Sequence, residues 1–124
     1  MKKTNLQYHI AFETKERRPF FQEQTVKQKM AEVFFRIAQE QNVKIETLAI
    51  RPEHVHMRIS TQPGFQLQRF MQFIRGKASY LIKKECPELK DLVSRTGLWS
   101  KSYFARTTGP VTSWKVDDYI QKQK

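Results

Sequence analysis

Apolar and polar residues alternate along several short segments, which is the period of a strand with one buried face. The clearest are residues 6–13 and 54–60, where apolar side chains occupy every second position. Residues 43–50 and 101–107 are read as two further strands. Each clear strand therefore has one apolar face, available for packing, and one polar face that is left open.

Between these strands, apolar residues recur with the period of a helix. Residues 21–41 carry an apolar stripe made of Val26, Met30, Val33, Phe34, Ile37 and Ala38. A second stripe begins at Leu67 and ends near Cys86; its members are Leu67, Phe70, Met71, Ile74, Ala78 and Leu81. Both stripes predict amphipathic helices. The stretch from residue 87 to 100 shows no regular period, so no element is predicted there.

A short terminal helix is predicted after the last strand. Gly109 and Pro110 interrupt the strand pattern, and Thr112 can cap a helix that runs to the C-terminus. The complete order is strand, helix, strand, strand, helix, strand and terminal helix. This order predicts an α+β fold with a ferredoxin-like antiparallel sheet and helices on one face. With 124 residues, the chain is expected to form one domain over residues 1–124.

The net charge of the chain points to an anionic partner. Lys and Arg number 23 against 12 acidic residues, a formal charge of +11, which favours nucleic acid over an anionic membrane surface. No apolar run approaches the roughly 18 residues of a membrane span, and residues 1–5 contain no signal-peptide stretch. Cys86 is the single cysteine, so no internal disulfide is possible. We therefore expect a cytoplasmic protein without a membrane partner.

The third strand carries two histidines two positions apart. Residues i and i+2 of a strand point to the same side, so His54 and His56 can converge on one metal ion while Val55 faces the core. Arg58 shares that face, and His9 lies on the polar face of the first strand. The alternative is a chance pair of surface histidines. Two imidazoles completed by oxygen ligands would form an open site that suits Mg²⁺ or Mn²⁺.

The terminal helix contains a second candidate group. Tyr119 and Gln123 are four residues apart, so they share one helical face, where an amide oxygen could reach a metal and a hydroxyl a bound phosphate. Tyrosines more often pack their rings, and that alternative stays open on spacing alone. Tyr103, near the end of the last predicted strand, is the main rival nucleophile.

Short motifs, in shared order and spacing over nearly the whole chain, resemble one family of DNA-processing enzymes. The string Arg51-Pro52-Glu53-His54-Val55-His56-Met57 resembles the histidine–hydrophobe–histidine motif of HUH endonucleases. The other matching segments are residues 8–19, the Gly-Lys-Ala-Ser of residues 76–79, segments within residues 98–109 and the Asp-Tyr-Ile-Gln-Lys-Gln of residues 118–123. Together they resemble the single-tyrosine transposases of the smallest bacterial insertion sequences and their relatives, the REP-associated tyrosine transposases.

This resemblance implies specific roles. His54, His56 and Gln123 correspond to the metal ligands, and Tyr119 corresponds to the nucleophile that forms a 5′-phosphotyrosine link with single-stranded DNA. The family's members recognise DNA hairpins and look like homodimers in which the tyrosine helix completes the partner's site. The resemblance therefore implies metal-dependent nicking and strand transfer, with Mg²⁺ or Mn²⁺ as cofactor.

Basic residues spread over the chain are candidates for DNA contacts. They are Lys15, Arg17, Arg18, Arg58, Arg69, Arg75, Lys77 and Arg106. Most are expected to contact phosphates, which set affinity and salt dependence more than sequence choice. The alternative function is a non-catalytic nucleic-acid-binding module on the same fold. Such modules stack bases on aromatic residues of the sheet, whereas the two clearest strands expose histidines and Arg58.

Overall fold

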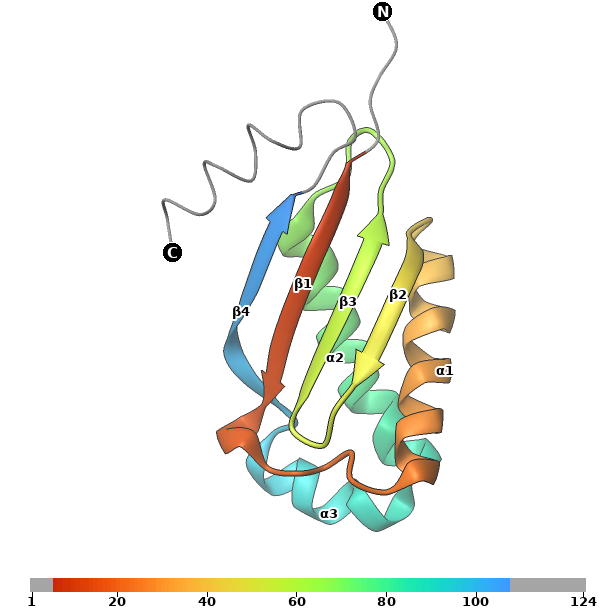
Figure 1. Cartoon of the computed structure of the whole chain (residues 1–124). Coiled ribbons are helices and arrows are strands. Elements are labelled where there is room, and N and C mark those ends of the chain that lie inside the picture. The colour runs from red at the N-terminus through yellow and green to blue at the C-terminus, as the bar shows by residue number, and fades with distance from the viewer. Residues whose placement is uncertain (1–5, 108–124) are drawn as a thin grey trace, which may run out of the picture.

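The computed structural model describes residues 6–107, in which four strands form one antiparallel sheet. Its order is β2-β3-β1-β4, so β1 and β3 are the central strands (Figure 1). The strands are β1 (Gln7–Thr14), β2 (Lys44–Ile50), β3 (His54–Ser60) and β4 (Trp99–Thr107). This is the sheet of a ferredoxin-like fold, and the predicted α+β class is confirmed.

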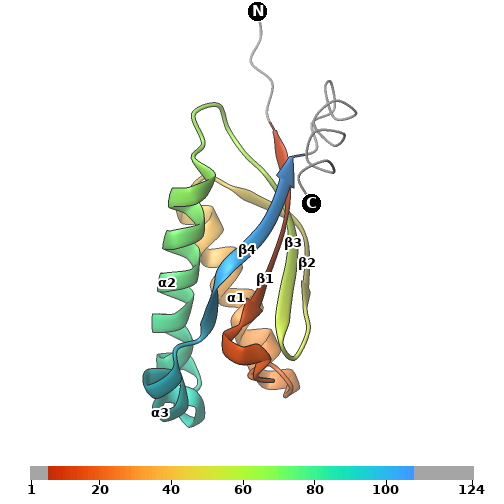
Figure 2. The ribbon, with the colours of Figure 1, turned by 90° about the vertical axis from the view of Figure 1, so that its left-hand side faces the viewer.

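Helices α1 and α2 cover one face of the sheet and leave the other without a helix among the described residues (Figure 2). The helical elements are α1 (Gln24–Glu40), α2 (Leu67–Glu85), α3 (Pro87–Thr96) and the short 3-10 turn η1 (Lys15–Arg17). The α3 helix lies at the end of α2, beside the turn that follows β1. The two-layer arrangement leaves the open sheet face accessible for chemistry.

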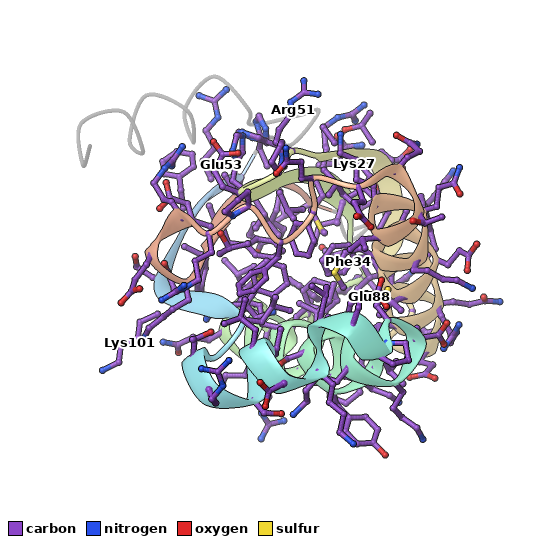
Figure 3. The ribbon with its side chains drawn as sticks, turned by 90° about the horizontal axis from the view of Figure 1, so that it is seen from below. Lys27, Phe34, Arg51, Glu53, Glu88 and Lys101 are labelled. Atoms are coloured by element: carbon purple, nitrogen blue, oxygen red, sulfur yellow. The ribbon has the colours of Figure 1, made fainter. Side chains whose placement is uncertain are left out.

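The core lies between the sheet and the helices. All six residues of the predicted α1 stripe are buried, and Phe34 lies among the side chains of this layer (Figure 3). Its ring is 6.0 Å from that of Phe12 on β1 and 6.2 Å from that of Trp99 on β4. Full burial of each such side chain stabilises the fold by about 1.5–3 kcal/mol. These contacts hold the central strand β1 and the edge strand β4 against α1.

No element was predicted over residues 87–100, whereas Pro87–Thr96 form the helix α3. Pro87 stands in its first turn, Arg95 in its last turn, and Gly97 follows with a positive φ of 84°. Leu89, Leu92 and Val93 follow the i, i+3, i+4 spacing of a helix and pack on the core, so the helical period is present in the sequence, although it covers only ten residues and was missed. The β4 strand also begins earlier than expected, at Trp99 rather than at residue 101.

The predicted terminal helix, with Thr112, Tyr119 and Gln123, and the break at Gly109 and Pro110 lie outside the described residues. The prediction of one domain over residues 1–124 also extends beyond them and stays a prediction. Within residues 6–107 the buried apolar side chains form one cluster.

Candidate active site

The β3 strand presents both histidines on the open face of the sheet. Val55 and Met57 are buried, with 0% and 1% exposure, whereas His54 and His56 are half-buried on the opposite side. The two imidazole rings lie edge to face with their centroids 4.9 Å apart. The predicted convergence of the two side chains is therefore observed.

Residues of the neighbouring strand β1 lie directly beside this histidine pair. Glu13 lies directly opposite His54, and the small residue Ala11 lies opposite His56. The ring of His9, the next open-face residue, is 5.9 Å from the ring of His56. An open hollow of about 510 Å³ is lined by Ala11, Phe12, Glu13, Arg17, His54, His56, Ser100, Ser102, Tyr103 and Phe104.

The surroundings of His56 favour its neutral form. Partial burial lowers the pKa of His56 below its ordinary value, and positive charge on His54, His9 and Arg51 lowers it further. A neutral imidazole keeps a lone pair for a cation, so this shift suits a metal ligand.

The available donors match a metal site that is completed from elsewhere. In residues 6–107, no group of three or more His, Cys, Asp or Glu side chains is placed to hold a metal ion. Among residues 6–107, the buried Nδ1 atom of His54 has no hydrogen-bond partner, and His54 lines the hollow. Two imidazoles fit part of an octahedral Mg²⁺ or Mn²⁺ site, and at least one further donor must come from another segment, from water or from a substrate. The predicted ligand Gln123 and nucleophile Tyr119 lie outside the described residues.

Two arginines flank His9 across the open face. His9 pairs with Arg58 of β3 on one side and with Arg106 of β4 on the other. Side chains of directly paired residues lie about 5 Å apart at Cβ, so the three form a transverse arginine–histidine row next to His56. Arg58 donates to a neutral group, the Gln7 side-chain oxygen at 3.0 Å, and has no carboxylate partner among residues 6–107. The row therefore keeps its positive charge available to an anion.

Four of the predicted DNA contacts already have partners inside the protein. Arg17 bonds to Glu13 and Glu53, and Arg18 to Glu16. Arg75 donates to the backbone oxygens of residues 100 and 101, at 2.9 and 3.0 Å, and Lys77 donates to Glu40 at 3.0 Å. Their DNA role stays a prediction. Among residues 6–107, the candidates that have neither an ionic partner nor a backbone acceptor are Lys15, Arg58, Arg69 and Arg106.

The rival nucleophile, Tyr103, is held by packing. It lies on β4 opposite Phe12 and is half-buried against the core, with the Arg75 guanidinium 5.1 Å from its ring centroid. Tyr103 is also among the residues that line the hollow. These contacts explain the residue as a packing tyrosine, and the choice of Tyr119 as nucleophile stays a prediction.

Two features of the site were missed by sequence reasoning. Phe104, which is 38% exposed, lies opposite Ala11 on the open face. Its position follows from the register between β4 and β1, which no sequence motif predicted. Glu53 and Arg17 form an ion pair beside His54. Glu53 stands next to the histidine motif in the sequence, but Arg17 is brought there only by the turn after β1.

Comparison with known proteins assigns the chain to a family. A family model described as "Transposase IS200 like" matches residues 2–123. The chain belongs to the IS200-like transposase family. The resemblance inferred from the motifs is thereby confirmed, and DNA recombination by transposition is the activity class of this family.

Curated transposases are similar over most of this IS200-like chain. The transposase for insertion sequence element IS200 of Salmonella typhimurium is 28% identical over 119 residues, which cover 96% of this chain and 77% of that protein. The ISDra2 transposase TnpA of Deinococcus radiodurans is 26% identical over 87 residues, covering 70% of this chain and 62% of its own length.

Solved structures share the fold of this IS200-like chain. A candidate transposase from Deinococcus radiodurans R1 superposes with a TM-score of 0.78 at 25% identity, covering 99% of this chain and 98% of that one. A REP-associated tyrosine transposase bound to a REP hairpin has a TM-score of 0.64 at 14% identity, covering 97% and 67% of the two chains, and shows the shared fold. Within residues 6–107, no helix is long and apolar enough to cross a membrane.

Proposed function

We propose that this IS200-like transposase nicks and rejoins single-stranded DNA, with a divalent metal at the histidine pair and Tyr119 as the nucleophile. The observation that carries the proposal is the pair itself. His54 and His56 lie with ring centroids 4.9 Å apart, in an open hollow on the face of the sheet opposite α1 and α2 (Figure 2). A member of a transposase family needs a site for phosphodiester chemistry, and this hollow combines metal-type donors with nearby positive charge.

His54, His56 and Gln123 would hold Mg²⁺ or Mn²⁺. When bound, the ion supplies charge neutralisation and polarisation of the target phosphodiester. The chain's own residues bind and orient the DNA. In particular, the row formed by His9, Arg58 and Arg106 lies beside His56, where it would hold phosphates of the strand that enters the hollow.

The covalent step is an exchange of one phosphodiester for another. The Tyr119 hydroxyl oxygen attacks phosphorus, the bond from phosphorus to the 3′ oxygen of the upstream nucleotide breaks, and the proton of the hydroxyl ends on that oxygen. The products are a 5′-phosphotyrosine and a free 3′-hydroxyl. A second 3′-hydroxyl reverses the same step and joins new ends, so no external energy source is required.

The substrate is proposed to be single-stranded DNA that contains a hairpin, acted on by a homodimer. A solved protein of the same fold is described as bound to a REP hairpin. A small domain with an open sheet face gains burial by pairing, and docking of the tyrosine helix on the partner subunit would complete each site. The described residues of one chain contain no group of three or more His, Cys, Asp or Glu side chains placed to hold a metal ion, which is consistent with this arrangement.

The test is a cleavage assay on labelled hairpin-containing single strands with Mn²⁺, followed by denaturing electrophoresis. The wild-type chain should form a covalent protein–DNA species, while His54→Ala and His56→Ala should lose it and still bind DNA. Thr47→Ala changes an exposed residue of β2 that pairs with Arg58 and serves as a control on the same sheet. If either histidine variant cleaved at the wild-type rate, the metal assignment would be wrong.

The second candidate is a non-catalytic nucleic-acid-binding module, and Phe104 is the observation in its favour. An exposed aromatic ring on the sheet offers a base-stacking surface. This candidate predicts hairpin binding without any covalent species in Mn²⁺ or Mg²⁺, so the same assay separates the two.

A further inference from the structure

The backbone of Glu53 is held firmly at the start of β3. Its carbonyl oxygen accepts a hydrogen bond from the Thr14 backbone N–H at 3.0 Å and lies 3.1 Å from Thr14 Oγ1, whose single proton is shared with the closer Arg18 oxygen at 2.7 Å. Thr14 is fully buried. A further bond, from the Phe21 N–H to the Pro52 oxygen at 3.1 Å, ties the same two turns together. The residue before His54 is therefore fixed by the turn that follows β1.

The carboxylate of Glu53 is held from the same turn. Arg17 donates to Glu53 Oε2 at 2.9 Å and also bonds to Glu13, the residue opposite His54. Glu16 and Arg17 both have positive φ, 53° and 54°, a conformation that costs non-glycine residues of order 1–3 kcal/mol each and persists only where surrounding contacts impose it. The strained turn aims the Arg17 guanidinium at two carboxylates beside the metal-site histidine.

The other oxygen of this carboxylate faces His54. Glu53 Oε1 lies 4.0 Å from His54 Nδ1, and that nitrogen is buried with no hydrogen-bond partner among residues 6–107. A buried donor without a partner costs about 1–3 kcal/mol, and a carboxylate held this close can remove that cost by a small rotation. Figure 3 shows Glu53 on the outer side of the sheet, away from α3 and Phe34.

We propose that Glu53 is a positioning residue for the metal site: its Oε1 accepts the Nδ1–H of His54 and turns Nε2 toward the hollow, while Arg17 holds Glu53 in place. The inference rests on the proposed function and deepens it. Metal-binding histidines in proteins commonly donate their other ring N–H to such a carboxylate, which fixes the tautomer and the ring orientation. Arg17 is thereby assigned to the site's support rather than to a DNA phosphate.

The exposure of the residues distinguishes this network from an ordinary surface ion pair. The side chains of Glu53 and His54 are 29% and 26% exposed, and only the Arg17 end of the network is open to solvent, at 54%, whereas both partners of the Arg95–Asp91 pair on α3 are exposed, at 65% and 85%. Pairs as exposed as the latter contribute little. Arg95 and Asp91 therefore offer a matched control, with the same chemistry away from the open face.

The experiment measures Mn²⁺ affinity of the full chain, from the electron paramagnetic resonance signal of free Mn²⁺, together with thermal unfolding. Glu53→Ala should weaken Mn²⁺ binding about 10- to 100-fold. Glu53→Gln, which keeps an acceptor oxygen, should recover part of that loss. Arg17→Ala should also weaken Mn²⁺ binding, because the Glu53 carboxylate then loses the donor that holds it. Asp91→Ala and Arg95→Ala should bind Mn²⁺ like the wild type.

Two negative results have different meanings. If Glu53→Ala binds Mn²⁺ like the wild type while His54→Ala loses binding, Glu53 does not position His54 and only this inference is overturned. If His54→Ala binds as tightly as the wild type, or the wild type does not bind, the proposed metal site itself fails. A purely structural role for Glu53 is recognised by a lowered unfolding temperature with unchanged Mn²⁺ affinity, and it too overturns the inference.

Discussion

The arginine–histidine row on the open face makes a quantitative prediction about DNA binding. Replacing Arg58 and Arg106 by Gln removes two charges from opposite sides of His9 without changing the buried face of either strand. If each arginine contacts one phosphate of a single strand, each lost contact reduces the magnitude of the negative slope of log K against log salt by about 0.7. The slope of the double variant should then be shallower by about 1.4. Over the tenfold range from about 1 M to about 0.1 M salt, the affinity of the variant should fall behind that of the wild type by about 25-fold.

The assay is fluorescence anisotropy of a labelled single strand in EDTA, between about 0.05 and 0.5 M salt. EDTA separates phosphate contacts from any contribution of the metal site. The matched control is Lys90→Gln with Arg95→Gln, which removes the same charge from exposed positions of α3. The reasoning is refuted if the open-face variant keeps the wild-type slope, or if the control flattens the slope equally, because the effect would then reflect net charge alone.

Two further predictions concern the fold and the assembly. Thr14→Val keeps the shape of a buried residue but removes a hydroxyl that lies 2.7 Å from the Arg18 oxygen, so thermal denaturation should show a loss of about 1 kcal/mol, or about 4 °C, and an unchanged midpoint would contradict it. A His56→Ala chain mixed with a Tyr119→Phe chain should regain some cleavage if each site is shared between subunits, and verified mixed dimers at background activity would exclude that arrangement.

The sheet and its two long helices were predictable because each buries one continuous apolar face. The α1 stripe shows this best, since all six predicted residues are buried. Short segments and helix ends were less predictable. Helix α3 spans only ten residues and buries only Val93 completely, and the helix expected from residue 21 begins at Gln24 because Phe21 is a buried loop residue.

The histidine pair was also predictable, because the two-residue period of a strand fixes the relative direction of side chains at positions 54 and 56. Contacts between distant segments were not. Arg17 lies 36 positions before Glu53 in the sequence, and only the hydrogen bonds between their two turns bring the guanidinium to the site. Several basic residues likewise looked equivalent in the sequence, although Arg75 is occupied by backbone oxygens of β4.

The central claim is that Tyr119 becomes covalently linked to DNA in a metal-dependent step, and peptide mapping of the protein–DNA species tests it most directly. The wild-type chain is incubated with a hairpin-containing single strand and Mn²⁺, digested with protease and nuclease, and analysed by tandem mass spectrometry. The account predicts a nucleotide remnant on the Tyr119 hydroxyl, absent in EDTA and in Tyr119→Phe. A remnant on Tyr103, or an undiminished adduct in Tyr119→Phe, would contradict it.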